Sequence, residues 1–203
     1  LFFHIGRPTS PDVAVVDGKK INLDDVNAMD RETFVSTFSQ MFTTQTWPAE
    51  RAWDARPFGS VSDLRSSFEN VVLAATQQEA EELIASYSDI VSLVLDGQGD
   101  EQSLADTANL SVGDLTDKEA EELRALASAY RKKFGRPLVI CVDNVVDRKH
   151  LLESGWRRVE HSPAREARFA LGEVIDIADL RFDQLVADAN PMRAAWDAGV
   201  ERL

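Results

Sequence analysis

The sequence predicts an all-α fold in a single domain. Apolar residues recur three and four positions apart along most of the chain, and recognisable start and stop residues bound these stretches. Only one short run, LVICV at 138–142, is typical of a strand. With 203 residues, of which 44% are hydrophobic, the chain can bury one sizeable core. We therefore expect a helical bundle over residues 21–188 with one extended segment at about 137–142, an extended arm over 1–20 and a helical tail over 189–203.

The predicted helices begin at side chains that can cap a helix. A Ser, Thr or Asp side chain accepts a hydrogen bond from an amide in the first turn, which otherwise has no partner within the helix. Such residues precede five of the amphipathic stretches: Asp30, Ser60 or Ser62, Thr76, Thr116 and Ser162. Thr76 and Thr116 are each followed three residues later by a glutamate, which is the pattern of a capping box. Pro48 favours the start of a further short helix.

The clearest helix of the second half covers residues 117–134 and ends at Gly135, because glycine readily adopts the left-handed conformation that closes a helix. The extended segment follows it, and two further stretches over 147–161 and 162–189 complete the bundle. Between residues 89 and 102, Gly97 and Gly99 interrupt the pattern, so we expect looser structure there. A short helix and a turn at Gly113 come next.

Composition and charge exclude several classes of function. The net charge of −13 and the pI of about 4.6 make nucleic acid an unfavourable partner, since an acidic surface repels phosphates. No apolar run approaches the roughly 20 residues that cross a bilayer, and no secretory signal is visible. The single cysteine, Cys141, lies in an apolar run, where we expect it to be buried, and it fits a reducing compartment. We therefore expect a cytoplasmic protein without a metal site, because one cysteine and three scattered histidines are a poor zinc-ligand set.

Two groups of motifs resemble those of a known family. The stretches YRKKFGRPLVICV and LLESGWRRVEHSPAREARFALGEVIDIADLRFDQL are similar to the C-terminal half of the 2-oxo-4-hydroxy-4-carboxy-5-ureidoimidazoline (OHCU) decarboxylases. In the N-terminal half, VNAMDRETFVSTFSQMF, Trp47, ERAWDARPF and SVSDL follow in the family's order. The resemblance extends from about Val26 to Leu185. It implies an all-helical decarboxylase of purine breakdown that needs no cofactor, acts on a small carboxylate and yields (S)-allantoin, and it is compatible with a homodimer.

The resemblance also implies which residues form the site. Arg158 stands where the family has an arginine, and its planar fork suits a substrate carboxylate. Tyr87 stands in place of the family's catalytic histidine, while the following Asp89 and Ile90 are retained. A phenol can donate a hydrogen bond but is a poor general base at neutral pH. His161, which replaces an asparagine beside the arginine, is a second candidate proton donor.

The family's glutamate has two possible counterparts. An alignment with few gaps places it at Asp106, with Ser103 nearby, whereas compensating gaps place it at Glu101; we favour Asp106. The resemblance further implies that the backbone of the extended segment, around Leu138 and Ile140, binds the substrate, because main-chain groups outside helices can pair with a planar ring rich in donors and acceptors. Arg136 in this segment would add a positive charge if it pointed into the site.

Each candidate also has a structural interpretation. Arg158 can be a surface arginine paired with Glu153 or Glu160, and Tyr87 a helix-end aromatic packed on the core. Asp106, His161 and Arg136 can be helix-end or solvated residues. Two functions therefore stay open. The chain is either a working decarboxylase for OHCU or a related ureido or imidazolinone acid, or an inactive relative that keeps the pocket as a ligand-binding or protein-interaction module.

Overall fold

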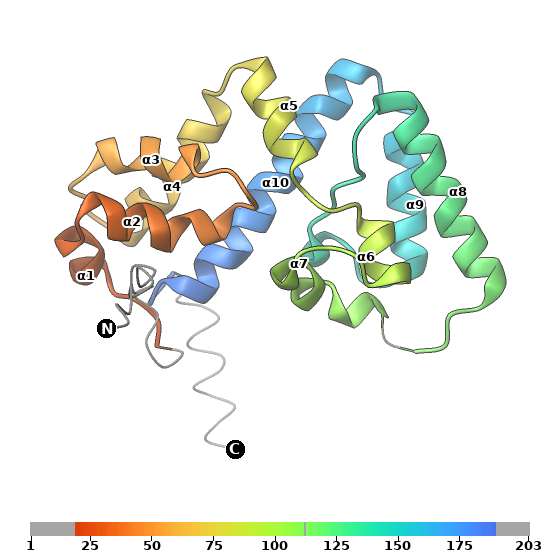
Figure 1. The fold of residues 1–203 in the computed structure, drawn as a ribbon, viewed down its shortest axis with the longest axis horizontal. Helices are drawn as coiled ribbons and strands as arrows, with labels where there is room; N and C mark the ends of the chain where they lie inside the picture. Colours follow the sequence, from red (N-terminus) through yellow and green to blue (C-terminus); the bar gives the residue numbers. More distant parts are fainter. Residues whose placement is uncertain (1–18, 112, 190–203) are drawn as a thin grey trace, which may run out of the picture. The chain divides into compact units, whose positions relative to one another are not determined.

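The computed structural model of this chain describes residues 19–111 and 113–189 (Figure 1). These residues are helical apart from connecting segments and one isolated parallel bridge, between Ile21 and Val186. The all-α prediction is confirmed. The described residues divide into two compact units, the first made of 19–42, 46–71 and 181–189 and the second of 43–45 and 72–180. The expected arm over 1–20 and tail over 189–203 lie almost entirely outside the described residues.

The first unit holds three short helices, most of a fourth and the last turn of α10. In chain order they are α1 (Leu23–Ala28), α2 (Arg31–Phe38), α3 (Trp47–Ala52), most of α4 (Val61–Leu73) and the last turn of α10 (Pro163–Leu185). Asp30 caps α2 as expected, since its Oδ1 accepts from Thr33 N at 2.8 Å. Aromatic rings form the core of this unit. They are Phe34, Phe38, Phe58, Phe68 and Phe182.

The second unit holds the remaining helices. They are α5 (Gln77–Ala85), α6 (Ile90–Asp96), α7 (Glu101–Asp106), α8 (Asp117–Phe134), α9 (Arg148–Val159) and most of α10. The capping box at Thr76 is confirmed, and so are the cap at Thr116 and the left-handed Gly135 that ends α8. The core lies between α6, α8 and α9. Leu123, Leu126 and Tyr130 of α8 are fully buried in it.

The expectation of loose structure after residue 89 was wrong, because residues 90–96 form helix α6. Asp89 caps this helix by accepting from Val91 N at 2.9 Å. Gly97, which we took as an interruption, is the left-handed residue that closes α6, with φ of 58°. A glycine at a helix end and a glycine in a loop are hard to tell apart in a sequence when the helix is only two turns long.

The extended segment is present between α8 and a 3-10 turn at Val142–Asn144. Residues 136–141 lie in no helix and are all buried. Leu138 is paired on both sides of its backbone: its carbonyl accepts from Ile90 N at 2.9 Å, and its N–H donates to Asp89 Oδ2 at 2.9 Å. Asp89 therefore starts α6 with one oxygen and holds the extended segment with the other.

No helix in the described part of the chain combines the length and apolar character that a bilayer crossing requires.

Candidate functional site

A cavity of about 650 Å³ lies in the second unit, beside the extended segment. Its walls come from the last turns of α9, the first four turns of α10 and residues 140–145. This volume is in the range that holds a small ligand. The cavity is therefore built by three consecutive parts of the chain, the end of the extended segment with the turn after it, α9 and α10.

The cavity is rich in positive charge although the chain is strongly acidic. Four arginines and one histidine line it: Arg157, Arg158, Arg165, Arg168 and His161. Only two carboxylates, those of Glu173 and Asp176, are among its lining residues. In a protein with a net charge of −13, this local excess of guanidinium groups favours an anionic ligand.

Arg158 is the buried arginine of the cavity, with 2% of its surface exposed. Its Nε donates to Glu166 Oε1 at 2.7 Å, its Nη2 lies against the same oxygen, and its Nη1 donates to the carbonyl of Val139. The alternative of a surface arginine paired with Glu153 or Glu160 is therefore wrong. Arg158 ties the end of α9 to the extended segment and lines the cavity at the same time.

Glu166, which is fully buried at the start of α10, is shared by three partners. Besides Arg158, the hydroxyl of Tyr130 donates to its Oε1 at 2.7 Å, and His161 Nδ1 lies 2.9 Å from its Oε2. A carboxylate has enough lone pairs for all of these bonds. Burial raises the pKa of Tyr130 to about 12, so this phenol stays protonated and acts as a donor. The network compensates the buried charge of Glu166.

His161 follows α9 and presents its ring to the cavity. Its side chain is 11% exposed, and the ring packs against Phe169 with the centroids 5.3 Å apart. Because Nδ1 faces Glu166, Nε2 is the ring nitrogen that can reach a ligand. His161 is thus a titratable group oriented by a buried carboxylate.

Glu173 is a cavity residue that the sequence analysis missed. It is buried on α10, and its Oε2 accepts from Cys141 N at 2.8 Å and from Asn144 Nδ2 at 2.9 Å. Burial raises the pKa of Glu173, and these two hydrogen bonds oppose the shift only in part. Its spacing of seven residues from Glu166 could have indicated it, since that spacing places both glutamates on one helix face.

The extended segment supplies less free backbone than we expected. The carbonyls of Leu138 and Val139 and the N–H groups of Leu138 and Cys141 are paired with Ile90, Arg158, Asp89 and Glu173. Ile140 lines the cavity, whereas Leu138 does not and is fully buried in the core.

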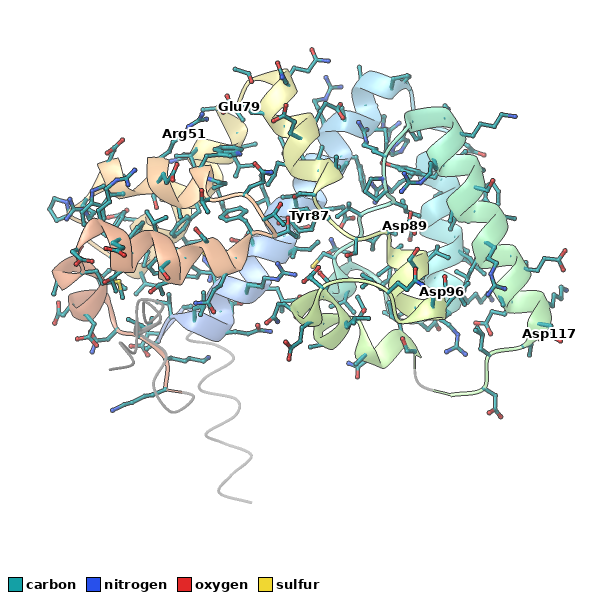
Figure 2. The ribbon with its side chains drawn as sticks, viewed as in Figure 1. Arg51, Glu79, Tyr87, Asp89, Asp96 and Asp117 are labelled. Atoms are coloured by element: carbon teal, nitrogen blue, oxygen red, sulfur yellow. The ribbon has the colours of Figure 1, made fainter. Side chains whose placement is uncertain are left out.

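Arg136 and Tyr87 lie outside the cavity lining. Arg136 is buried and binds Glu81 with one nitrogen, at 2.7 and 2.8 Å from the two carboxylate oxygens. Tyr87 lies between α5 and α6, next to Asp89 in Figure 2, and is 5% exposed. Its burial fits the structural interpretation of a core aromatic residue.

The three candidates on α7 also lie outside the cavity lining. Glu101 is exposed, and Asp106 accepts from Gln102 Nε2 at 2.8 Å on the surface of the helix. Ser103 is buried, with its N–H bound to the cap residue Asp100 at 3.0 Å. Of the predicted site residues, the structure therefore brings Arg158, His161 and Ile140 together and places the others elsewhere. Among the described residues, no group of His, Cys, Asp and Glu side chains forms a metal site.

Comparison with known proteins identifies the family. Residues 27–183 match the OHCU decarboxylase family. The chain is 32% identical to the OHCU decarboxylase of Haloferax volcanii over 162 residues, which cover 80% of this chain and 94% of that protein. It is 28% identical to the mouse OHCU decarboxylase over 162 residues, or 79% of this chain and 90% of the relative.

Two solved structures share the fold. An (S)-allantoin synthase matches 81% of this chain with a TM-score of 0.65 and 22% identity, and the chain covers 54% of that protein. An OHCU decarboxylase crystallised in the presence of (S)-allantoin matches 76% of the chain, and 96% of its own, with a TM-score of 0.57 and 17% identity. With more than three quarters of its length matched, this chain belongs to the OHCU decarboxylase family.

Proposed function

We propose that this chain decarboxylates 2-oxo-4-hydroxy-4-carboxy-5-ureidoimidazoline to (S)-allantoin in urate degradation. Family membership supports the reaction, and relatives in Haloferax volcanii and mouse carry the name of this enzyme. The observation that carries the proposal for the site is the arginine-lined cavity beside the extended segment. The substrate is a small carboxylate, and this cavity offers both the volume and the charge for it. The homodimer stays a prediction.

Arg158 is the proposed anchor of the substrate carboxylate. A guanidinium has five N–H groups, and the contacts to Glu166, Val139 and Tyr130 use four of them. One hydrogen on Nη1 is left for a ligand, and the exposed arginines of the cavity, such as Arg168, add further donors. Because Arg158 is held by buried partners, it presents this donor in a fixed direction, which is what alignment of the scissile bond requires.

The reaction needs two things from the protein. The bond between the ring and the carboxylate must lie along the ring's π system, so that its electrons pass into the ring as CO2 leaves. The resulting carbanion must then be stabilised and protonated on one face. The positive charge of the cavity serves the first need by holding the carboxylate, and a proton donor in the cavity serves the second.

The test is to generate the substrate in place from urate with the two preceding enzymes and to follow the circular dichroism of (S)-allantoin. The protein is expected to accelerate formation of the S enantiomer over spontaneous decay. Absence of any acceleration would overturn the proposal, and binding of allantoin without acceleration would favour the alternative of a ligand-binding module.

Arg158→Lys tests the anchor, because lysine keeps the charge but loses the planar fork. We expect kcat/KM to fall by about 10-fold or more, which corresponds to about 1.4 kcal/mol of transition-state stabilisation. Arg124→Lys is the matched control, since Arg124 is an exposed residue of α8 paired with Asp96 outside the cavity. Equal activity of both variants would show that Arg158 does not bind the substrate.

A further inference from the structure

We propose that His161, oriented by Glu166, delivers the proton to C5 of the substrate, the ring carbon that carries the ureido group and becomes the stereocentre of (S)-allantoin. This inference rests on the proposed function and adds the identity of the proton donor to it. The position of His161 carries the argument: it follows α9, lines the cavity together with Arg158, and contacts a buried carboxylate with one nitrogen only.

The orientation of the ring is set by contacts on two sides. Nδ1 lies 2.9 Å from Glu166 Oε2, and Phe169 packs against the ring face. Among the described residues, Nε2 has no hydrogen-bond partner. A histidine whose Nδ1–H is held by a carboxylate has a fixed tautomer and a fixed direction for Nε2, which is the arrangement that acid–base catalysis requires.

The other titratable groups near the cavity are less suited to this role. Tyr130 already donates its hydroxyl proton to Glu166. The Oε2 of Glu173 is bound by Cys141 N and Asn144 Nδ2, so its carboxyl group is held against residues 141–144. Burial raises the pKa of the Cys141 thiol to about 12, and its side chain is buried. The charged groups that line the cavity with His161 are Arg157 and Arg158 from α9 and Arg165, Arg168, Glu173 and Asp176 from α10.

The proposed step is balanced as follows. His161 begins as an imidazolium, with Nδ1–H on Glu166 and Nε2–H toward the substrate. The bond between C4 and the carboxylate breaks, CO2 leaves, and the electron pair forms a C4=C5 double bond while the π pair of the C5=N bond moves to the ring nitrogen. The 4-hydroxyl becomes a carbonyl, and its proton goes to the ring nitrogen through water. The C4=C5 π pair takes the Nε2 proton, which forms the new C5–H bond. His161 is left neutral with Nδ1–H still on Glu166, and a proton from water restores the imidazolium.

His161→Gln removes the proton donor but keeps a side-chain amide that can bind Glu166. The matched control is His150→Gln, because His150 lies at the start of α9, where its Nδ1 accepts from Val146 N, outside the cavity lining. General acid catalysis contributes about 100-fold to 10,000-fold, so kcat of His161→Gln is expected to fall at least about 100-fold. KM is expected to change much less, because the carboxylate anchor remains.

Two further readouts separate proton delivery from a structural role. In the wild type, kcat is expected to fall as the pH rises and the imidazolium is lost, and this alkaline fall is expected to be absent in His161→Gln. The residual product of His161→Gln is also expected to lose enantiomeric excess, since water protonates either face. The control variant is expected to keep the wild-type pH profile and the S product.

The outcomes distinguish this inference from the proposed function. A wild type without activity would overturn both. An active wild type together with a His161→Gln variant of unchanged kcat, pH profile and enantiomeric excess would overturn the inference alone. If His161→Gln does not fold, NMR of the wild-type histidines decides: adding (S)-allantoin is expected to shift the ring signals of His161 and not those of His150, and an unmoved His161 signal would overturn the inference.

Discussion

At the scale of single residues, two buried glutamates seven positions apart on α10 differ in the groups that stabilise their carboxylates. Glu166 receives hydrogen bonds from a buried arginine, a tyrosine and a histidine. Glu173 is bound by a backbone N–H and the Asn144 amide, which are neutral donors. Burial therefore raises the pKa of Glu173, and the two hydrogen bonds and the charge of Arg158 oppose this shift without cancelling it. Glu166 therefore fixes the cavity residues Arg158 and His161, whereas Glu173 is a cavity residue with a raised pKa.

The raised pKa of Glu173 predicts how stability depends on pH. The folded state binds the proton of Glu173 more tightly than the unfolded state, so this residue costs stability as the pH rises above its ordinary pKa of 4.5. Glu173→Gln removes that cost and keeps an oxygen for Cys141 N. We expect its free energy of unfolding, relative to wild type, to grow between about pH 4 and about pH 8 in urea titrations. A difference that stays constant with pH would contradict the prediction.

At the scale of elements, local chemistry was predictable and long-range pairing was not. The caps at Asp30, Thr76 and Thr116 were read from side chains three residues from their partners, so the sequence alone was sufficient. The extended segment was located correctly, but its partners lie far along the chain. Leu138 binds a carboxylate 49 residues before it, and Cys141 binds one 32 residues after it. Such pairings depend on packing, which periodicity does not encode.

In the site too, residues that depend on long-range contacts could not be predicted from the sequence. Arg158 and His161 were identified by the resemblance and do lie together, whereas Tyr87 and Asp106 were matched by position and lie outside the cavity lining. Glu173 was missed because a glutamate within an apolar stripe is indistinguishable from a solvated residue until its partner is known. Burial of a charged residue follows from its compensating contacts, and those contacts come from other elements.

The packing of α8 on α9 depends on one glycine. A Cβ at Gly155 of α9 would lie 2.4 Å from Leu126 Cδ2, and Leu126 is fully buried in α8. Overpacking of this kind costs about 1 to 3 kcal/mol, and over most of this range the cost exceeds the gain of about 1 kcal/mol that alanine brings over glycine within a helix. We therefore expect Gly155→Ala to lower the free energy of unfolding, measured by urea denaturation.

Gly172→Ala is the matched control for this substitution. Gly172 also lies inside a helix, and a Cβ there would meet nothing within 4 Å. Helix propensity alone predicts a gain of up to about 1 kcal/mol for this variant. Stabilisation by both substitutions would show that Leu126 moves aside at low cost, and the close approach of α8 and α9 would then not depend on glycine.

At the scale of the whole molecule, the charge of the cavity is opposite to that of the chain. The net charge of −13 disfavours an anion at long range, so binding depends on guanidinium groups gathered within a short distance. All the residues that line the cavity lie between 140 and 176, within the second unit. The first unit, with its separate aromatic core, contributes none of them among the described residues.

Because all the cavity-lining residues lie in the second unit, a ligand is expected to slow hydrogen exchange there and not in the first unit. At a concentration of about 100 times its Kd, (S)-allantoin would stabilise the bound state by about 2.7 kcal/mol. In hydrogen exchange followed by mass spectrometry, we expect slower exchange in peptides that cover 138–176, and unchanged exchange in 23–58. The Arg158→Lys variant at the same ligand concentration is the control and is expected to show less protection. Equal protection of both ranges would mean that the ligand also binds or orders the first unit, and the cavity beside the extended segment would then not be a complete description of the site.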